Sequence, residues 1–394
     1  MTTSLSSPTP RRRDVALAIL RYFPHGGLQR IALGVAQALS KRGHRVRLFT
    51  QSWDGPLPSD QSIQTECLPG RGTTNHVRAK SFAAQLRHAL QSAPADVVLG
   101  FDRLPGLDLY FGGDPCYSAR LRRDRSALAR WTPRARTFLA LERAVFAPEA
   151  RPRILLMNPA EAAVIRAEYG TPEDRFRVLP PGFMAPGLAF SKDPAEREKR
   201  REVARQRLFE ELGLRRASCL VALGSDFHRK GFDRAVRALA AARDRGHSAV
   251  LLVAGSDSAG RLLRLSRSLG VGESVRLLGP RDDTEDILNA ADILIHPARS
   301  EPAGMVILEA LAAGCPVLTT AAVGYAEHVT RAGAGAVLTA PFKQALLDAA
   351  LVDLLTQPSE IPRQRAYDYA DTLDPRAMER SVVHEVESHL RVGP

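Results

Sequence analysis

Short apolar runs alternate with longer amphipathic segments along most of the chain, from residue 14 onward. The runs are rich in Val, Ile, Leu and Ala and are bounded by Gly, Pro or polar turns, as is typical of buried strands in a parallel sheet. The predicted strands are 15–20, 45–50, 96–101, 154–158, 219–224, 249–254, 274–278, 292–296 and 317–319. Because helical patterns separate these strands, the sequence predicts an α/β protein with doubly wound, Rossmann-like sheets.

The first strand is followed by a glycine-containing loop and a predicted helix. Apolar residues recur at helical spacing after the loop, and Gly43 stands where the helix would end. The positions on this apolar face are Leu28, Ile31, Ala32, Val35 and Leu39. A strand, a loop, a helix and a second strand follow one another here. In parallel sheets, units of this kind bind ligands beyond the carboxyl ends of their strands.

The length of 394 residues and a break in the pattern both indicate two domains. Prolines and glycines, followed by charged residues, interrupt the alternation between residues 180 and 200. We therefore predict a disordered tail over 1–13, an N-terminal domain over 14–190, a C-terminal domain over 191–365, and a helical segment over 366–394 that packs back on the N-terminal domain. The two domains are expected to face each other across a cleft.

The composition excludes several classes of protein. With 44% hydrophobic and 25% charged residues the chain is globular, and its longest apolar runs are too short to cross a bilayer. The four cysteines lie far apart and form no zinc or disulfide pattern. The net charge of +12 favours an anionic partner, although a general bias toward arginine explains part of it.

Common signatures of other enzyme classes are absent from the sequence. There is no GxGxxG after the first strand, no P-loop motif, no HExxH and no GxSxG. An Asp-x-Asp pair that would hold a divalent ion against a diphosphate is absent too. We therefore expect a site without metal and without a cofactor.

Gly26 and Gly27 precede the first predicted helix. Two glycines allow a ligand to approach the backbone at the positive end of a helix, where an anion is favoured. The same pair also suits a plain connection between strand and helix. Gly26 and Gly27 are therefore candidates for donor binding only together with other loops.

Arg229 and Lys230 follow the first strand of the second half. A planar guanidinium beside a compact ammonium group suits the two phosphates of a nucleotide diphosphate. We place the pair at the first turn of a helix, where two cations oppose the helix dipole unless an anion is present. Arg229 and Lys230 are therefore candidate catalytic and donor-binding residues.

Glu301 and Glu309 give the sharpest signal. Pro302 suits the first turn of a helix, and Glu309 is the only charged residue from 303 to 314. A carboxylate on an apolar helix needs a partner, because burying it unpaired is costly. The hydroxyls of a ribose or hexose are good partners, and a structural salt bridge is the alternative.

Two further residues are weaker candidates. Asp114 follows a glycine pair and could orient an acceptor hydroxyl or simply start a turn. His296 ends a predicted strand, and we interpret it as a structural histidine.

The spacing of Glu301 and Glu309 resembles the motif of the family-4 retaining glycosyltransferases with the GT-B fold. Residues 22–30, 49–53, 105–108, 224–231 and 317–320 extend the resemblance to members that build the lipopolysaccharide core, over nearly the whole chain. The resemblance implies transfer of a hexose from a UDP-sugar, most simply UDP-glucose, to an inner-core heptose at the cytoplasmic face of the inner membrane.

The resemblance also implies roles for residues. Glu309 would bind the ribose, and Arg229 with Lys230 the diphosphate. The donor hexose would be bound by Glu301 and the backbone of Ala303, Gly304, Met305 and Val306. Gly26 and Gly27 would approach the phosphates, and Asp114 would lie near the anomeric carbon. Retention is explained by attack on the front face, with the leaving phosphate taking the acceptor proton, so no side-chain nucleophile is required.

One position departs from the family pattern. Ile31 stands where a related enzyme has Asp, so UDP-galactose, a UDP-amino sugar and a UDP-uronic acid are alternative donors. A UDP-sugar epimerase of the same architecture is an alternative function. A non-enzymatic anion-binding protein is a third reading, but it leaves Glu301 and Glu309 unexplained. The linkage position on the acceptor and the oligomeric state do not follow from the sequence.

A basic segment between residues 120 and 136 predicts peripheral membrane binding by an otherwise cytoplasmic protein. It mixes cations with large apolar side chains, as does a segment that lies on an anionic bilayer. A solvated basic helix is the alternative. Its candidate residues are Arg120, Arg122, Arg123, Arg125, Arg130, Trp131, Arg134 and Arg136. We expect no nucleic-acid partner, because no aromatic platform or basic groove helix is evident.

Overall fold

A computed structural model describes residues 12–24, 26–124, 127–183, 191–215 and 217–392. It divides the chain into two compact units. The first consists of residues 1–180 and 376–394, and the second of residues 181–375. The predicted tail over 1–13 lies largely outside the described residues.

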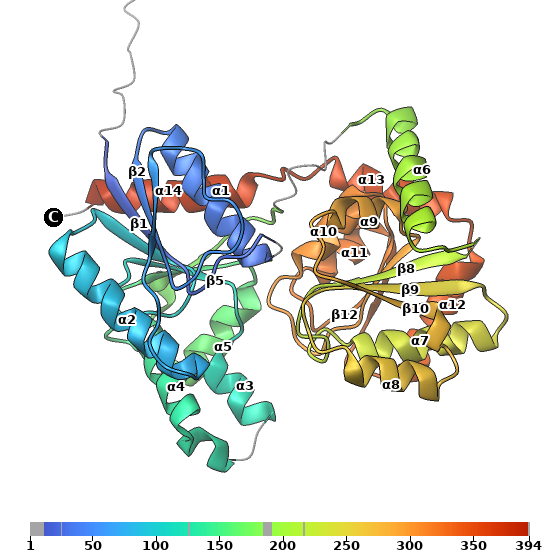
Figure 1. The fold of residues 1–394 in the computed structure, drawn as a ribbon, viewed down its shortest axis with the longest axis horizontal. Coiled ribbons are helices and arrows are strands. Elements are labelled where there is room, and N and C mark those ends of the chain that lie inside the picture. Colours follow the sequence, from blue (N-terminus) through green and yellow to red (C-terminus); the bar gives the residue numbers. More distant parts are fainter. Residues whose placement is uncertain (1–11, 25, 125–126, 184–190, 216, 393–394) are drawn as a thin grey trace, which may run out of the picture. The chain divides into compact units, whose positions relative to one another are not determined.

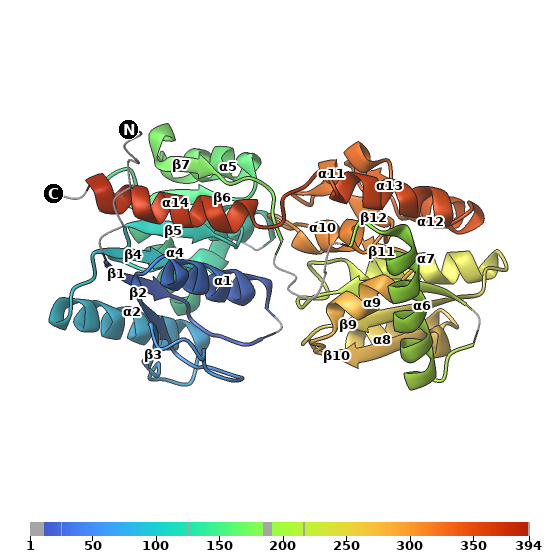
Figure 2. The ribbon, with the colours of Figure 1, turned by 90° about the horizontal axis from the view of Figure 1, so that it is seen from above.

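The first unit is built on a parallel sheet of seven strands in the order β3-β2-β1-β4-β5-β6-β7. Its strands are β1 (Asp14–Ala18), β2 (Arg45–Thr50), β3 (Ile63–Cys67), β4 (Val97–Gly100), β5 (Leu109–Gly112), β6 (Arg153–Leu156) and β7 (Phe176–Val178). Its α-helices are α1 (Gly27–Lys41), α2 (Asn75–Ser92), α3 (Tyr117–Asp124), α4 (Pro133–Phe146), α5 (Pro159–Tyr169) and α14 (Ala377–Val392). Helix α2 packs on α4 and α1 packs on α14, and helices cover both faces of the sheet (Figures 1 and 2).

The second unit repeats this architecture with six parallel strands in the order β10-β9-β8-β11-β12-β13. Its strands are β8 (Ser218–Leu223), β9 (Ala249–Ala254), β10 (Val275–Gly279), β11 (Ile293–His296), β12 (Val317–Thr320) and β13 (Gly335–Leu338). Its α-helices are α6 (Pro194–Glu211), α7 (Phe232–Asp244), α8 (Gly260–Ser268), α9 (Thr284–Ala290), α10 (Met305–Ala312), α11 (Ala326–Ala332), α12 (Gln344–Thr356) and α13 (Glu360–Ala370).

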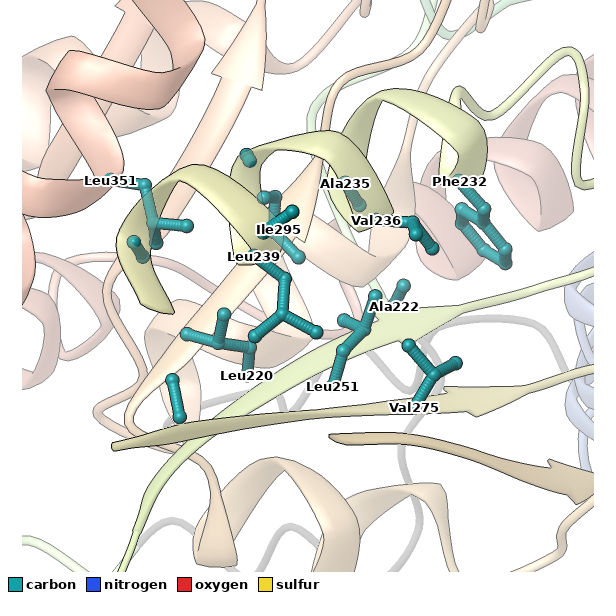
Figure 3. Close-up of a cluster of buried hydrophobic side chains, with 14 of the residues drawn as sticks. Leu220, Ala222, Phe232, Ala235, Val236, Leu239, Leu251, Val275, Ile295 and Leu351 are labelled. Atoms are coloured by element: carbon teal, nitrogen blue, oxygen red, sulfur yellow. The ribbon is translucent and has the colours of Figure 1, made fainter. Parts of the chain in front are cut away.

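The core of the second unit shows why these strands and helices form. Strands β8 and β9 are buried on both faces, so they consist of nearly unbroken apolar runs. Helix α7 lays its apolar face over them, with Phe232, Val236 and Leu239 against Leu220 and Leu251 (Figure 3). All five of these side chains are fully buried. The predicted fold class of two Rossmann-like sheets is therefore confirmed.

The predicted strands agree with the structure to within one or two residues at each end. Strands β3, β5, β7 and β13 were not predicted, because they are short or only partly buried and their apolar runs are brief. The predicted helix after Gly27 is α1, and Gly43 follows it with a φ of 91°. Ile31 is 1% exposed on α1 and belongs to the core of the first unit.

The domain boundaries differ from those predicted. The chain passes to the second unit at Pro180–Pro181, about ten residues before the predicted position, and returns at Arg376 rather than at 366. Helix α13 belongs to the second unit because Tyr367 packs over Gly314, where a Cβ would overlap its ring. Helix α14 belongs to the first unit, where Glu387 accepts hydrogen bonds from Arg42 Nε at 2.5 Å and Nη2 at 2.8 Å.

Candidate functional site

Three charged side chains meet at the carboxyl edge of the second sheet. Glu301 Oε2 accepts hydrogen bonds from Arg229 Nη1 at 2.8 Å and from Lys230 Nζ at 2.7 Å. Arg229 and Lys230 follow β8, and Glu301 follows β11, which is paired with β8. Parallel strands end at the same edge of a sheet, so residues 71 positions apart are brought together. We call Arg229, Lys230 and Glu301 the charged triad.

The electrostatics of the triad favour a fully ionised Glu301. Burial alone would raise the pKa of Glu301, but Lys230 and Arg229 lower it to about 2. Its side chain is 14% exposed and that of Lys230 is 12% exposed. The carboxylates of Glu301 and, for Arg229, of Asp226 hold the two cations in place at the edge of the sheet.

The loop that carries Arg229 and Lys230 has an unusual backbone. Asp226 has a φ of 61°, a conformation that costs free energy for a residue other than glycine. Its carboxylate accepts from the backbone N–H of Arg229 at 3.3 Å and from Nε of Arg229 at 3.0 Å. Gly224 has a φ of 116°, a conformation that favours glycine, and a Cβ there would lie 2.7 Å from Lys230 Cε.

The cations precede helix α7 rather than occupying its first turn, which corrects the sequence prediction. The helix begins at Phe232, and Gly231 before it has a φ of 74°. Arg229 and Lys230 therefore lie in the turn that leads into the helix. The cations are held by Glu301 and, for Arg229, also by the carbonyl of Ser300 at 3.0 Å.

The segment from Glu301 to Glu309 also differs in one respect from its prediction. Helix α10 begins at Met305, so Pro302 lies in the preceding loop and not in the first turn. Gly304, with a φ of 80°, occupies the N-cap because a Cβ there would overlap Val323. Glu301 is fixed by its backbone, which donates to Ala322 O and accepts from Gly324 N–H, both at 3.0 Å.

Glu309 is buried on α10 and is 5% exposed. Its neighbours Ile307, Leu308, Ala310 and Leu311 are fully buried. The expected carboxylate on an apolar helix is therefore present in the structure. Ala303 is buried as well, whereas Met305 and Val306 are partly exposed.

His296 lies beneath the charged triad at the end of β11. Its Nε2 lies 4.0 Å from Glu301 Oε2, its side chain is fully buried, and neither ring nitrogen has a hydrogen-bond partner. Burial, and then the charge of Lys230, lower the pKa of His296 to about 3. The ring is therefore neutral at physiological pH and adds no third cation.

The other candidates lie in the first unit. Gly26 is the N-cap of α1, and a Cβ there would overlap Gln29 Oε1, so Gly26 makes room for that side chain. Gly27 is the first residue of α1 and is partly exposed. Asp114 is exposed after β5, and its carbonyl accepts from Arg103 Nη2 at 3.0 Å.

Sequence reasoning missed a buried ionic cluster behind Asp114. Arg103 Nη1 lies 3.2 Å from Glu142 Oε1, and the fully buried Glu142 also accepts from the N–H groups of Tyr117 and Ser118. Asp102 accepts from the N–H of Leu20 at 2.6 Å, and burial raises its pKa to about 6. The available signal was the pair Asp102-Arg103 directly after a predicted strand.

No group of three or more His, Cys, Asp or Glu side chains that could hold a metal ion occurs in the part of the chain that the structure describes. Among the described residues, no helix is long and apolar enough to span a bilayer.

The basic segment forms α3, a short 3₁₀ helix over Ala127–Trp131, and the start of α4. Trp131 is 77% and Leu128 78% exposed, and Arg130, Arg134 and Arg136 are exposed around them. Arg122 forms an ion pair with Glu168, Arg120 packs over Tyr117, and Arg123 also has a charged neighbour. Arg125 lies outside the described residues.

Each unit matches a family model. The model described as glycosyltransferase family 4 matches residues 25–183, and that described as glycosyl transferases group 1 matches residues 205–372. The lipopolysaccharide glucosyltransferase WaaG of Escherichia coli K12 is 38% identical over 364 residues, which make up 91% of this chain and 95% of that protein.

Solved structures agree with this relationship. A crystal structure of WaaG, a glycosyltransferase involved in lipopolysaccharide biosynthesis, has a TM-score of 0.88 at 37% identity and covers 94% of this chain and 99% of its own. The Anabaena protein HepE in complex with UDP and glucose has a TM-score of 0.71 at 17% identity, covers 96% of this chain and 100% of its own, and supports the fold alone.

The buried neutral state of His296 predicts a pH dependence of stability. Below about pH 6.5 the unfolded chain takes up a proton at this histidine, whereas the folded chain does so only near pH 3. Stability is therefore lost as the pH falls through this window, by about 2 kcal/mol at pH 5 relative to pH 7.

We expect His296→Asn to abolish this part of the loss in chemical denaturation measured from pH 7 to pH 5. His88→Asn, the same substitution at an exposed position on α2, is the matched control. Parallel stability curves for the wild type and His296→Asn would contradict the buried neutral state.

Proposed function

The chain belongs to the family-4 glycosyltransferases with the GT-B fold, and on this premise we propose that it transfers a hexose from a UDP-sugar, UDP-glucose foremost, to an inner-core heptose of lipopolysaccharide. Its reaction class is that of a retaining, nucleotide-sugar-dependent hexosyltransferase of lipopolysaccharide core biosynthesis. The observation that carries the proposal is the charged triad at the carboxyl edge of the second sheet.

The charged triad supplies a binding site for the donor diphosphate. Arg229 and Lys230 bind the two phosphates and stabilise the negative charge that grows on the leaving group as the glycosidic bond breaks. Because both cations are already held in place by Glu301, little reorganisation is required when the donor binds.

The two carboxylates have different parts of the donor as partners. Glu301 contacts a hydroxyl of the hexose, and the backbone of Ala303, Gly304, Met305 and Val306 lies along the sugar. Glu309 accepts from the ribose hydroxyls.

The first unit supplies the acceptor side. We assign Gly26 and Gly27 to donor binding and Asp114 to the acceptor hydroxyl. The ionic cluster of Arg103 and Glu142 holds the loop of Asp114 through its carbonyl group. The acceptor oxygen attacks the front face of the anomeric carbon, and its proton passes to the leaving phosphate.

A donor screen tests the function. Purified enzyme is incubated with UDP-glucose, UDP-galactose, a UDP-amino sugar and a UDP-uronic acid, each with and without a heptose-terminated core oligosaccharide. We expect transfer from UDP-glucose that requires the oligosaccharide and retains the anomeric configuration. Conversion of one UDP-sugar into another without acceptor would instead identify an epimerase, and turnover of none would contradict both.

Substitution of the two glutamates separates binding from transfer. Glu309→Ala weakens the affinity for UDP itself, because the ribose contact is shared by the ground state and the transition state. Glu301→Ala leaves UDP affinity closer to that of the wild type and lowers kcat by about a hundredfold, in the range for loss of one preorganised contact.

Calorimetric titration with UDP and initial rates of transfer measure these two effects. The variants Glu309→Gln and Glu301→Gln control for changes of side-chain volume. Equal UDP affinity of the wild type and a folded Glu309→Ala would remove the ribose assignment.

We expect the reaction to proceed without metal and without a cofactor, because Arg229 and Lys230 supply the positive charge that a divalent ion supplies in other transferases. Rates of transfer in excess EDTA should equal those in added Mg²⁺ or Mn²⁺. Abolition by EDTA and rescue by either ion would overturn this expectation.

The enzyme acts at the cytoplasmic face of the inner membrane through peripheral binding. Trp131 and Leu128 insert at the interface, and Arg130, Arg134 and Arg136 attract anionic lipid, each by about 1 kcal/mol. Arg122 is already paired with Glu168, so the exposed cations near Trp131 are the better anchors.

Cosedimentation with vesicles of phosphatidylglycerol and phosphatidylethanolamine tests this surface. We expect the bound fraction to fall with salt and to fall several-fold when Arg130, Arg134 and Arg136 are replaced by Gln. Replacing the exposed Arg237, Arg245 and Arg261 of the second unit by Gln removes the same charge elsewhere and is the control. Equal binding by the two triple variants would show that this segment is not the anchor.

A further inference from the structure

A second cationic group lies at the carboxyl edge of the first sheet. Arg21 follows β1, Trp53 follows β2, and Asn75 and Arg78 begin α2 after β3. Strands β1, β2 and β3 are adjacent in the sheet, so their loops meet at one edge. The hydrogen bond from Tyr22 N–H to Ser52 O at 3.0 Å joins the first two loops.

Two arginines converge on one neutral oxygen in this group. Asn75 Oδ1 accepts from Arg21 Nη2 at 3.4 Å and from Arg78 Nη2 at 3.2 Å. Neither arginine forms an ion pair with any residue that the structure describes. Nε of Arg78 is buried and has no hydrogen-bond partner. Like charges at a shared neutral acceptor repel each other, and an anion between them would remove that repulsion.

The surroundings of these arginines differ from the rest of the first unit. Arg47 is paired with Asp14, Arg42 with Glu387 and Arg153 with Glu385. By contrast, the sequence contains no Asp or Glu between residues 66 and 96, whereas it contains Arg71, Arg78, Lys80 and Arg87. Asp54 and Asp102 belong to neighbouring loops at this edge, through hydrogen bonds to Tyr22 O and from Leu20 N–H, but neither forms an ion pair with Arg21 or Arg78 among the described residues.

The two arginines are also held by their backbones. Gln29 Nε2 donates to the carbonyl of Arg21 at 3.1 Å, and Gln51 Nε2 donates to the carbonyl of Arg78 at 3.2 Å. Gly26 leaves the space that the Gln29 side chain occupies. Because the backbone on each side is fixed, the guanidinium groups are directed to the same region.

An aromatic surface adjoins the arginines. The rings of Tyr22 and Trp53 are stacked, with centroids 3.7 Å apart and planes 10° apart. Tyr22 is buried beneath, Trp53 is partly exposed, and Trp53 Nε1 donates to Pro56 O at 3.1 Å. A fixed indole with an accessible part can pack against the C–H face of a sugar ring, because the π face of the indole is negative.

We propose that Arg21, Asn75 and Arg78 bind an acidic group, a phosphate or a carboxylate, on the acceptor glycan, while Trp53 packs against the adjoining sugar ring. This inference rests on the proposed function and adds to it an acceptor subsite that recognises a negatively charged group. Paired guanidinium groups bind either oxyanion through charge-assisted hydrogen bonds. The donor diphosphate is bound elsewhere, by the charged triad of the second unit.

Acceptor binding and transfer are measured with one heptose oligosaccharide in three forms: phosphorylated and carboxylated, treated with phosphatase, and reduced at its carboxyl groups. We expect the wild type to bind and glycosylate the untreated form with a KM about tenfold lower than that of the form lacking the recognised group. Whichever treatment raises the KM identifies the group as phosphate or carboxylate.

The double variant Arg21→Gln/Arg78→Gln should lose this preference. Its KM for the untreated acceptor should rise about tenfold, with kcat and UDP affinity within about twofold of those of the wild type. Arg87→Gln, an exposed arginine on the same helix, is the matched control and should keep the preference. Trp53→Leu should raise the KM for all three forms alike, because it removes the platform and not the charge.

Several results would overturn the subsite. These are equal affinity of the wild type for all three forms, an unchanged preference in Arg21→Gln/Arg78→Gln, and a loss of UDP affinity that matches the loss of acceptor affinity. Reduced binding of the double variant to anionic vesicles without acceptor, with the oligosaccharide preference intact, would assign the arginines to lipid headgroups instead.

The failure of the proposed function is a separate result. Titration of the three oligosaccharides in the absence of donor reports the subsite without requiring transfer. Absence of transfer to every form by a wild type that still distinguishes them would contradict the transferase proposal and leave the charge-reading subsite supported.

Discussion

The second unit depends on one constraint, namely that a carboxylate removed from water must be paired. Glu301 is mostly buried, and leaving its charge uncompensated would cost several kcal/mol. The backbone before Arg229 and Lys230 has two positive φ angles, 116° at Gly224 and 61° at Asp226. The strained backbone at Asp226 and the glycine at position 224 thus accompany ion pairs that compensate the charge of Glu301. The same cations are then available for a diphosphate.

Both units place their chemistry where parallel strands end. The edge of the second sheet brings together residues 229, 230 and 301, and the edge of the first brings together residues 21, 53, 75 and 78. The two edges differ in charge compensation, because a carboxylate pairs with the cations of the second and an amide oxygen with those of the first. A compensated site can hold cations in place before a ligand arrives, whereas an uncompensated one gains more when an anion binds.

The sequence predicted the elements that a strong pattern specifies. Strand β9 has the predicted bounds because its apolar run is continuous and ends before Gly255, and β2 has them too although it includes Arg45 and Arg47. Strand β7, with one buried residue of three, has no such run and was missed. The starts of α7 and α10 were misplaced because the left-handed conformations of Gly231 and Gly304 depend on tertiary contacts, with Pro297 and Val323 respectively.

Candidate residues could be identified from the sequence where a residue type is unusual within its own segment. Glu309 was expected on an apolar helix and is 5% exposed on α10, whereas Arg229 and Lys230 lie before α7 and not in its first turn; the roles of these residues stay predictions. The contacts of Arg229 and Lys230 with Glu301 were not predictable, because they span 72 and 71 positions and depend on strand order. The Arg103 and Glu142 pair was missed for the same reason, since neither residue is unusual in its own segment.

The net charge of +12 raised the question of whether arginine marks a binding face or only a biased composition. Many of the arginines have structural partners. Arg175 donates to the carbonyls of Val145, Ala147 and Pro152, and Arg205 to those of Ala290 and Ala217. Guanidinium groups here close loops by satisfying buried carbonyl groups, which is a stabilising role that needs no anion. Composition alone is therefore a poor guide to function in this chain, and the informative cations are those that the fold gathers at the carboxyl edge of a sheet.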